Sequence, residues 1–137
     1  MSRMSDDAMK EAFERVLEGL GLDPVACREG DGWWRFQHQL PSQGGIHSRD
    51  FRVVATLCEL SSDADLDALY ADMEAANAAL PPGSLARFVE ADNYLHVEAK
   101  APFEGLDAGG MRALVDACAA LGGSDAGRSL RSRYRSW

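Results

Sequence analysis

Lysine, histidine and long apolar runs are all scarce in this chain of 137 residues. Lys10 and Lys100 are the only lysines, and 14 basic against 22 acidic residues give a net charge of −8, which argues against a nucleic-acid-binding surface. No apolar run approaches the ~20 residues that a membrane-spanning helix needs, and no export signal is visible at the N-terminus. The glycine-rich motifs that cradle nucleotide phosphates are also missing. These absences favour a protein that neither inserts into a membrane nor binds nucleic acid.

Cysteine and histidine are few and widely spaced. The cysteines form no C-x-x-C pair, and their odd number fits free thiols in a reducing compartment better than a disulfide framework. No histidine stands three or four residues from another histidine or from a cysteine, so the sequence contains no local metal site. The residues concerned are Cys27, Cys58, Cys118, His38, His47 and His96. We therefore expect a cytoplasmic protein without a metal or other cofactor.

Three segments have the apolar spacing of amphipathic helices. Apolar side chains recur every three or four positions in residues 6–21, 63–79 and 107–121. Ser61-Ser62 is expected to cap the second helix, and Gly122-Gly123 to close the third. Each helix then has one face to bury against a sheet.

Five segments have the composition or the alternation of β-strands. They are residues 25–27, 33–40, 51–60, 85–90 and 94–101. Residues 41–50 combine proline, serine and glycine and are expected to form a loop. The order α-β-β-β-α-β-β-α predicts an α+β fold of two layers, with an antiparallel five-stranded sheet packed against helices.

The basic residues are concentrated at the C-terminus. Residues 1–121 are expected to form a single domain, and residues 122–137 a basic tail with four arginines and one aspartate. Because the rest of the chain is strongly acidic, we expect this tail to fold back on that surface or to be a solvated end. Tyr134 and Trp137 stand among the arginines, so binding of an anionic partner is an alternative.

Two segments have weak catalytic or metal-binding patterns. Asp63-x-Asp65-x-Asp67 resembles the start of a calcium loop, but Ala68 replaces the glycine that such a loop needs, so we interpret the acids as belonging to a helix N-terminus. The loop around His47 carries histidine, serine and aspartate together, as an enzyme or a small-molecule site can. Our expectation is a protein that is not an enzyme, with this loop as the alternative site.

Several short motifs resemble the YbjN family of small bacterial proteins. They are Asn77-Ala78-Ala79-Leu80-Pro81-Pro82-Gly83, Pro102-Phe103-Glu104-Gly105-Leu106, Leu114-Val115-Asp116-Ala117-Cys118 and the aromatic strand Trp34-Arg35-Phe36. The match covers roughly residues 8–121. That family is similar in fold to the class I chaperones of type III secretion, which are small, acidic and dimeric. The resemblance implies a non-catalytic, chaperone-like or regulatory protein that binds a polypeptide partner and forms a homodimer.

Candidate interaction residues lie on the second predicted strand and on two predicted helices. Trp33 and Trp34 are adjacent on a strand and must point to opposite faces, so Trp33 lies outside the core unless residues 41–50, the tail or a partner cover it. We predict that Trp33 binds the partner together with Phe13 and Val16 of the first helix. The dimer interface that the resemblance implies would contain Leu69, Tyr70 and Met73.

Overall fold

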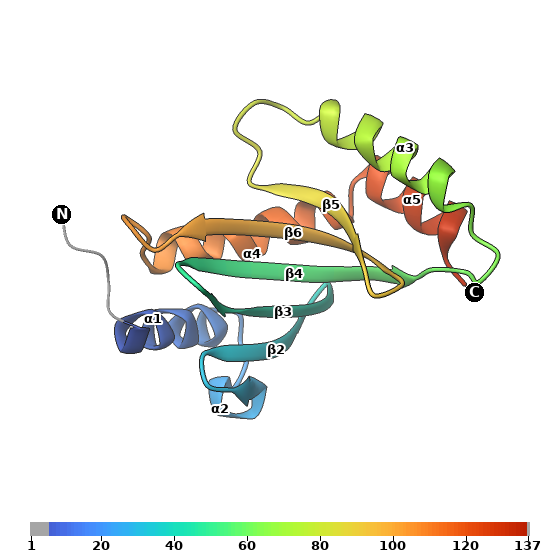
Figure 1. Cartoon of the computed structure of the whole chain (residues 1–137). Coiled ribbons are helices and arrows are strands. Elements are labelled where there is room, and N and C mark those ends of the chain that lie inside the picture. The colour runs from blue at the N-terminus through green and yellow to red at the C-terminus, as the bar shows by residue number, and fades with distance from the viewer. Residues whose placement is uncertain (1–5, 137) are drawn as a thin grey trace.

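The computed structural model describes residues 6–136, which form five helices and six strands (Figure 1). In chain order these elements are α1 (Asp6–Gly19), α2 (Pro24–Cys27), β1 (Arg28–Gly30), β2 (Trp33–His38), β3 (Leu40–His47), β4 (Asp50–Glu59), α3 (Leu66–Ala78), β5 (Ala86–Ala91), β6 (Tyr94–Pro102), α4 (Ala108–Gly122) and α5 (Asp125–Tyr134).

The strands form one antiparallel sheet in the order β1-β2-β3-β4-β6-β5. The first four strands follow one another as a meander, and the β5–β6 hairpin joins this meander through pairing of β6 with β4. The predicted α+β fold is confirmed, although the sheet has six strands rather than five.

Two strands lie outside the predicted ones: β1, which directly follows the predicted strand 25–27, and β3, in a segment where the sequence predicted a loop. β3 lies between β2 and β4, and its two glycines are required by close packing rather than by a turn. A Cβ atom at Gly44 would come within 2.8 Å of the Phe13 ring, and one at Gly45 within 2.0 Å of the Trp33 indole. Glycine at these positions therefore lets an aromatic side chain lie directly on each side of the strand.

Two other sequence predictions were also wrong, one on the type of an element and one on the cap of a helix. Residues 25–27, expected to be a strand, belong to α2, because the side chain of Asp23 accepts a hydrogen bond from Val25 N at 3.0 Å and Pro24 stands in the first turn. The cap of α3 is Asp65, whose side chain accepts from Ala68 N at 3.1 Å, and not the Ser61-Ser62 pair. Both helices begin with an aspartate that satisfies a free backbone N–H group.

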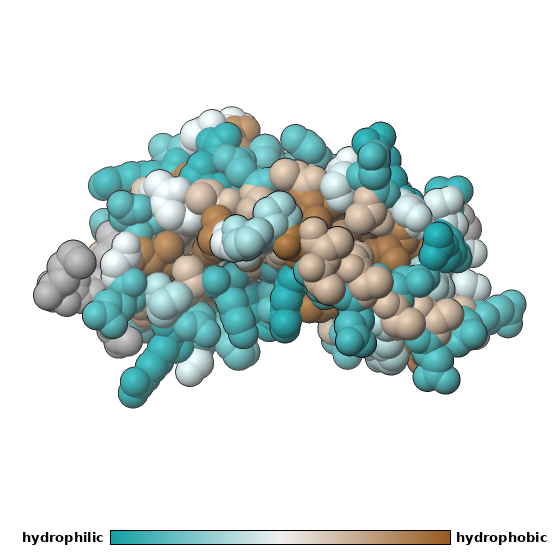
Figure 2. Space-filling view, turned by 90° about the horizontal axis from the view of Figure 1, so that it is seen from above, coloured by the Kyte–Doolittle hydropathy of each residue, from teal (hydrophilic) through white to brown (hydrophobic). Residues whose placement is uncertain are grey.

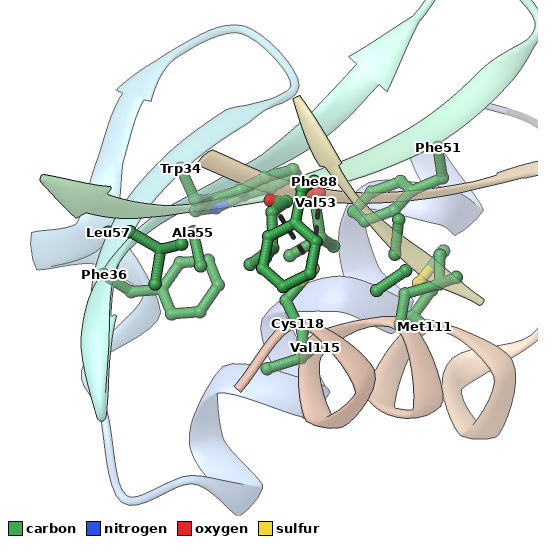
Figure 3. Packing of buried hydrophobic residues seen from close by; sticks show 14 of the residues in the cluster. Trp34, Phe36, Phe51, Val53, Ala55, Leu57, Phe88, Met111, Val115 and Cys118 are labelled. Atoms are coloured by element: carbon green, nitrogen blue, oxygen red, sulfur yellow. Dashed lines mark hydrogen bonds between the residues drawn. The ribbon is translucent and has the colours of Figure 1, made fainter. Parts of the chain in front are cut away.

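The core lies between one face of the sheet and helices α1 and α4 (Figure 3). Phe13 of α1 packs against Trp34, Phe36 and Phe51, with ring centroids 5.1, 5.8 and 4.8 Å away. Cys118 of α4 is buried in the same core, and burial raises the pKa of its thiol to about 12. This thiol is therefore a core side chain.

The segment expected to be a C-terminal tail contains α5, which packs against α3, α4 and β4. Leu130 and Tyr134 are only 4% and 6% exposed and belong to the same core cluster as Leu69 and Met73 of α3. Ser124 caps the helix by accepting a hydrogen bond from Gly127 N at 3.1 Å. Residues 125–134 thus form a packed element of the fold.

Polar contacts hold the end of α5 against α3 and β4. Asp72 of α3 accepts hydrogen bonds from Tyr134 Oη and, at 2.7 Å, from Arg133 Nη1. Tyr134 O accepts from Ser61 N at 2.9 Å, and Ser136 N donates to Glu59 O at 3.0 Å. The basic segment therefore folds back on an acidic residue of the body, one of the two arrangements that its charge predicted. Trp137 lies outside the described residues.

Candidate functional site

An apolar groove lies beside the C-terminal end of α3. It has a volume of about 540 Å³ and is enclosed by the end of α3, the segment that leads into β5, the end of α4 and the start of α5. Side chains that line this apolar groove include Ala76, Leu80, Leu85, Ala117, Ala120 and Leu121. Leu85 is 49% exposed, and Figure 2, which views the molecule from the side of α3, shows apolar side chains gathered on this side. Asp125 is the only titratable residue in the lining, so the groove offers mainly apolar contact.

Two further large side chains are exposed on the side of α3 that α5 does not cover, which we call its outward side. Leu66 and Tyr70 stand four residues apart on that side and are 48% and 49% exposed. Tyr70 Oη donates a hydrogen bond to Glu90, which ties α3 to β5 and raises the pKa of the phenol. The side chain of Tyr70 is thus anchored at its polar end while its ring stays accessible.

The predicted dimer residues occupy different environments. Leu69 is fully buried and Met73 is 7% exposed, because α5 packs against the side of α3 that carries them. The sequence did not predict that α5 covers this side of α3. It placed Leu69 and Met73 at an interface between two copies of the chain instead. Of the three residues, Tyr70 alone is exposed.

The predicted partner-binding residues are also separated. Phe13 is fully buried and Val16 is 6% exposed, because the apolar side of α1 faces the sheet. Neither side chain lies on the exposed surface of the chain, and a role of these two residues in partner binding stays a prediction. Trp33 is half-buried, and its indole lies over Gly45 of the neighbouring strand, so residues 41–50 cover part of it.

A polar cleft of about 260 Å³ lies beside the β3–β4 turn that follows His47. Its lining contains the histidine, serine and aspartate that the sequence singled out, together with residues of β4 and β6: His47, Ser48, Asp50, Arg52, Glu98 and Lys100. Arg52 Nη2 pairs with Glu98 Oε2 at 2.7 Å, while the buried Nε of Arg52 has no hydrogen-bond partner within residues 6–136. The structure thus brings titratable groups together here, although no side-chain hydrogen bond joins His47 to Ser48 or Asp50 in the described part of the chain.

A second polar contact follows the same strands. Thr56 Oγ1 and His96 Nδ1 lie 3.1 Å apart across β4 and β6, and the His96 ring stacks on Tyr94. Burial lowers the pKa of His96, with a smaller contribution from the nearby Arg52 charge. The neutral imidazole is therefore favoured in the folded protein.

The residues with possible metal or redox roles remain apart. Within residues 6–136, no three His, Cys, Asp or Glu side chains are grouped closely enough to hold a metal ion. Asp65, from the calcium-like pattern, is the N-cap of α3. Cys27, Cys58 and Cys118 are free thiols. None of the helices in this part of the chain is both long and apolar enough to cross a membrane.

The apolar groove was missed because its lining comes from four separate segments. Single alanines and leucines of α3, α4 and α5 carry no pattern that distinguishes a groove from ordinary core. The one available signal was the apolar pair Leu130 and Tyr134, four residues apart in the arginine-rich segment, which is typical of a helix that packs on the body.

Comparison with solved structures identifies the fold. A chain of the ExsC–ExsE complex superposes with a TM-score of 0.64 at 10% identity, covering 91% of this chain and 95% of that one. A chain of the heterodimeric ExoU–SpcU complex from the type III secretion system of Pseudomonas aeruginosa gives 0.59 at 15% identity, covering 88% and 96%. A chain of the HopA1–SchA chaperone–effector complex gives 0.59 at 13%, covering 96% and 99%.

These likenesses show a fold of the type III secretion chaperone kind, as the sequence predicted. No protein-family model matches the chain, and no curated protein matches it by sequence. The resemblance to the YbjN family stays a prediction.

Proposed function

We propose that this protein is a non-catalytic, cytoplasmic module that binds and shields a polypeptide partner, either as a chaperone or as a regulator. The observation that carries the proposal is the apolar groove, which presents exposed leucine and alanine side chains and a single carboxylate. Such a surface suits an apolar segment of a partly unfolded chain, because burial of apolar area needs no chemistry from the groove. The solved structures that share the fold include a chaperone–effector complex, which supports this function.

The YbjN resemblance belongs to the same proposal. Residues 77–83 carry its first motif, and Ala79, Leu80 and Pro81 from this motif line the apolar groove. In this proposal the motif shapes the apolar groove and also ends α3.

Selection of peptides tests polypeptide binding. A random peptide display library is panned on the full chain, with Leu85→Glu as the counter-selection and Val25→Glu as the matched control. Val25 is 64% exposed but lies in α2, outside the groove. We expect enriched peptides with several apolar residues that bind Leu85→Glu at least tenfold more weakly and Val25→Glu as tightly as the unchanged protein. Equal binding to all three proteins, or no enrichment, would refute the proposal.

We further propose a homodimer formed through the outward side of α3. The exposed ring of Tyr70 and the neighbouring Leu66 support it, since aromatic side chains are frequent anchors of interfaces. Light scattering at micromolar concentration is expected to give a dimer for the unchanged chain and for the control Glu18→Arg on α1, and a folded monomer for Tyr70→Arg. A monomeric unchanged chain would remove the dimer from the proposal without affecting the peptide test.

The polar cleft beside His47 supports a second candidate, an enzyme or a small-molecule-binding protein. Six polar side chains converge there, and the buried Nε of Arg52 has no partner among the described residues. Hydrolysis of p-nitrophenyl acetate tests the enzyme alternative, because a catalytic His47 would make His47→Ala inactive while the control His38→Ala kept its rate. Equal rates for the three proteins would contradict catalysis by this cleft.

A further inference from the structure

A third cleft lies on another part of the surface, where the β2–β3 turn, the end of β4 and the C-terminal end of α5 meet. Its volume is about 390 Å³, within the range of small-molecule sites. Leu40 and Pro41 supply accessible apolar surface, and Arg131 and Arg135 supply positive charge. This combination of an apolar wall and two guanidinium groups differs from both sites described above.

Neither of these two arginines is paired with an acidic residue in the described part of the chain. Within residues 6–136, no ion pair or hydrogen bond involves the side chain of Arg131 or Arg135, whereas Arg128 pairs with Asp125 at 3.5 Å and Arg133 with Asp72 at 2.7 Å. Of the four arginines in residues 125–135, two are thus paired within the fold and two are left facing a cleft.

The positive charges of these two residues repel each other when no anion lies beside them. Arg131 and Arg135 are four residues apart on one side of the helix, where like charges repel each other. The helix C-terminus favours positive charge, but Arg133 already supplies it while also pairing with Asp72. The half-buried Cys58 lines the same cleft. Burial raises the pKa of its thiol, and the positive charges of Arg131 and Arg135 partly offset that rise.

The lining also restricts the type of anion. Arginine binds carboxylate and phosphate equally well by geometry. However, Glu59 lies on the same rim and repels a doubly charged phosphate more strongly than a singly charged carboxylate. The apolar wall formed by Leu40 and Pro41 favours an anion that has an apolar part.

We propose that this cleft binds a carboxylate attached to a short apolar group. The carboxylate accepts hydrogen bonds from the N–H groups of Arg131 and Arg135, and the apolar group lies against Leu40 and Pro41. The carboxylate belongs either to a free small molecule or to an acidic side chain next to an apolar residue in a bound polypeptide.

Titration of the full chain with hexanoate, followed by ¹H–¹⁵N NMR, tests the proposal. We expect saturable shifts in the amides of residues 37–40, 56–59 and 131–136, and at least tenfold weaker binding of uncharged hexanamide and of inorganic phosphate. The double variant Arg131→Gln/Arg135→Gln is expected to bind hexanoate at least tenfold more weakly. Arg128→Gln, on the same helix, is the matched control and is expected to bind as the unchanged protein does.

Two blocked peptides that differ only in Leu-Glu against Leu-Gln distinguish the sources. Binding of the Glu peptide to the same amides, with no binding of the Gln peptide, assigns the carboxylate to a polypeptide, whereas binding of hexanoate alone assigns it to a small molecule. The proposal is overturned if hexanamide or phosphate binds as tightly as hexanoate, if the shifts lie elsewhere, or if the folded double variant binds hexanoate as tightly as the unchanged chain. Circular dichroism confirms that the variants are folded.

Discussion

Truncation of Leu130 to alanine is expected to destabilise the whole fold and not only α5. Leu130 is 4% exposed and lies in the core cluster that also contains Leu69, Met73 and Tyr134. Leu→Ala substitutions at such sites cost about 2–5 kcal/mol, and the place of α5 at the border of the core suggests about 2–3 kcal/mol. For a chain of this length that loss lowers the melting temperature by roughly 8–12 °C.

Urea unfolding and native-state hydrogen exchange measure this effect together. Because α5 packs on α3, α4 and β4, we expect the most protected amides of β4 and β6 to lose the same free energy as those of α5. The control Arg128→Ala, on an exposed part of the same helix, is expected to change stability by less than about 0.5 kcal/mol. If Leu130→Ala exposes only the α5 amides while β4 and β6 keep their protection, α5 is an appendage and the domain ends before it.

Three further predictions concern packing and pH. Gly45→Val is expected to lower the free energy of unfolding by about 3 kcal/mol in urea titrations, because even a Cβ atom there overlaps Trp33; an unchanged midpoint would contradict the packing. The pKa of His96 lies below its unfolded value of about 6.5, so folding stability falls as the pH drops through 6.5 toward the folded pKa. His96→Gln should remove that slope in melting curves between pH 5 and 7 and leave stability above about pH 7.5 less affected. The pKa of Glu14 is lowered chiefly by its hydrogen bonds with Arg28. Glu14 therefore stabilises the fold above its unfolded pKa, and this contribution is lost as the pH falls through the folded pKa. Glu14→Gln should flatten the acid limb of the curve of folding stability against pH.

The parts of the fold with strong local patterns were predictable from the sequence. In β6, Leu95, Val97 and Ala99 alternate with more polar residues, and all three are buried against the helices as period-two alternation requires. The apolar stripe of α1 likewise faces the sheet. In these elements one buried face and one outer face are enough to determine both the type of element and its orientation.

The parts that depend on distant partners were not predictable. Gly44 and Gly45 are typical of a loop by composition, and only the rings of Phe13 and Trp33 explain them as strand residues. In α5 the apolar signal consists of Leu130 and Tyr134 alone among arginines and serines. A pair this sparse becomes meaningful only when its partner helix, about sixty positions earlier in the chain, is known to lie beside it.

The place of α5 also determines which surfaces remain for interactions. Because α5 covers the Leu69 and Met73 side of α3, a second copy of the chain can reach α3 only from the outward side, where Tyr70 is exposed. The apolar groove begins at Ala76 of the same helix, less than two turns further on. In the proposed dimer, the two polypeptide-binding grooves would therefore lie next to the interface, so a client segment that leaves one groove would meet the partner copy. Client binding and dimerisation would then be energetically coupled, and a peptide selected on the groove should raise the dimer fraction measured at limiting protein concentration.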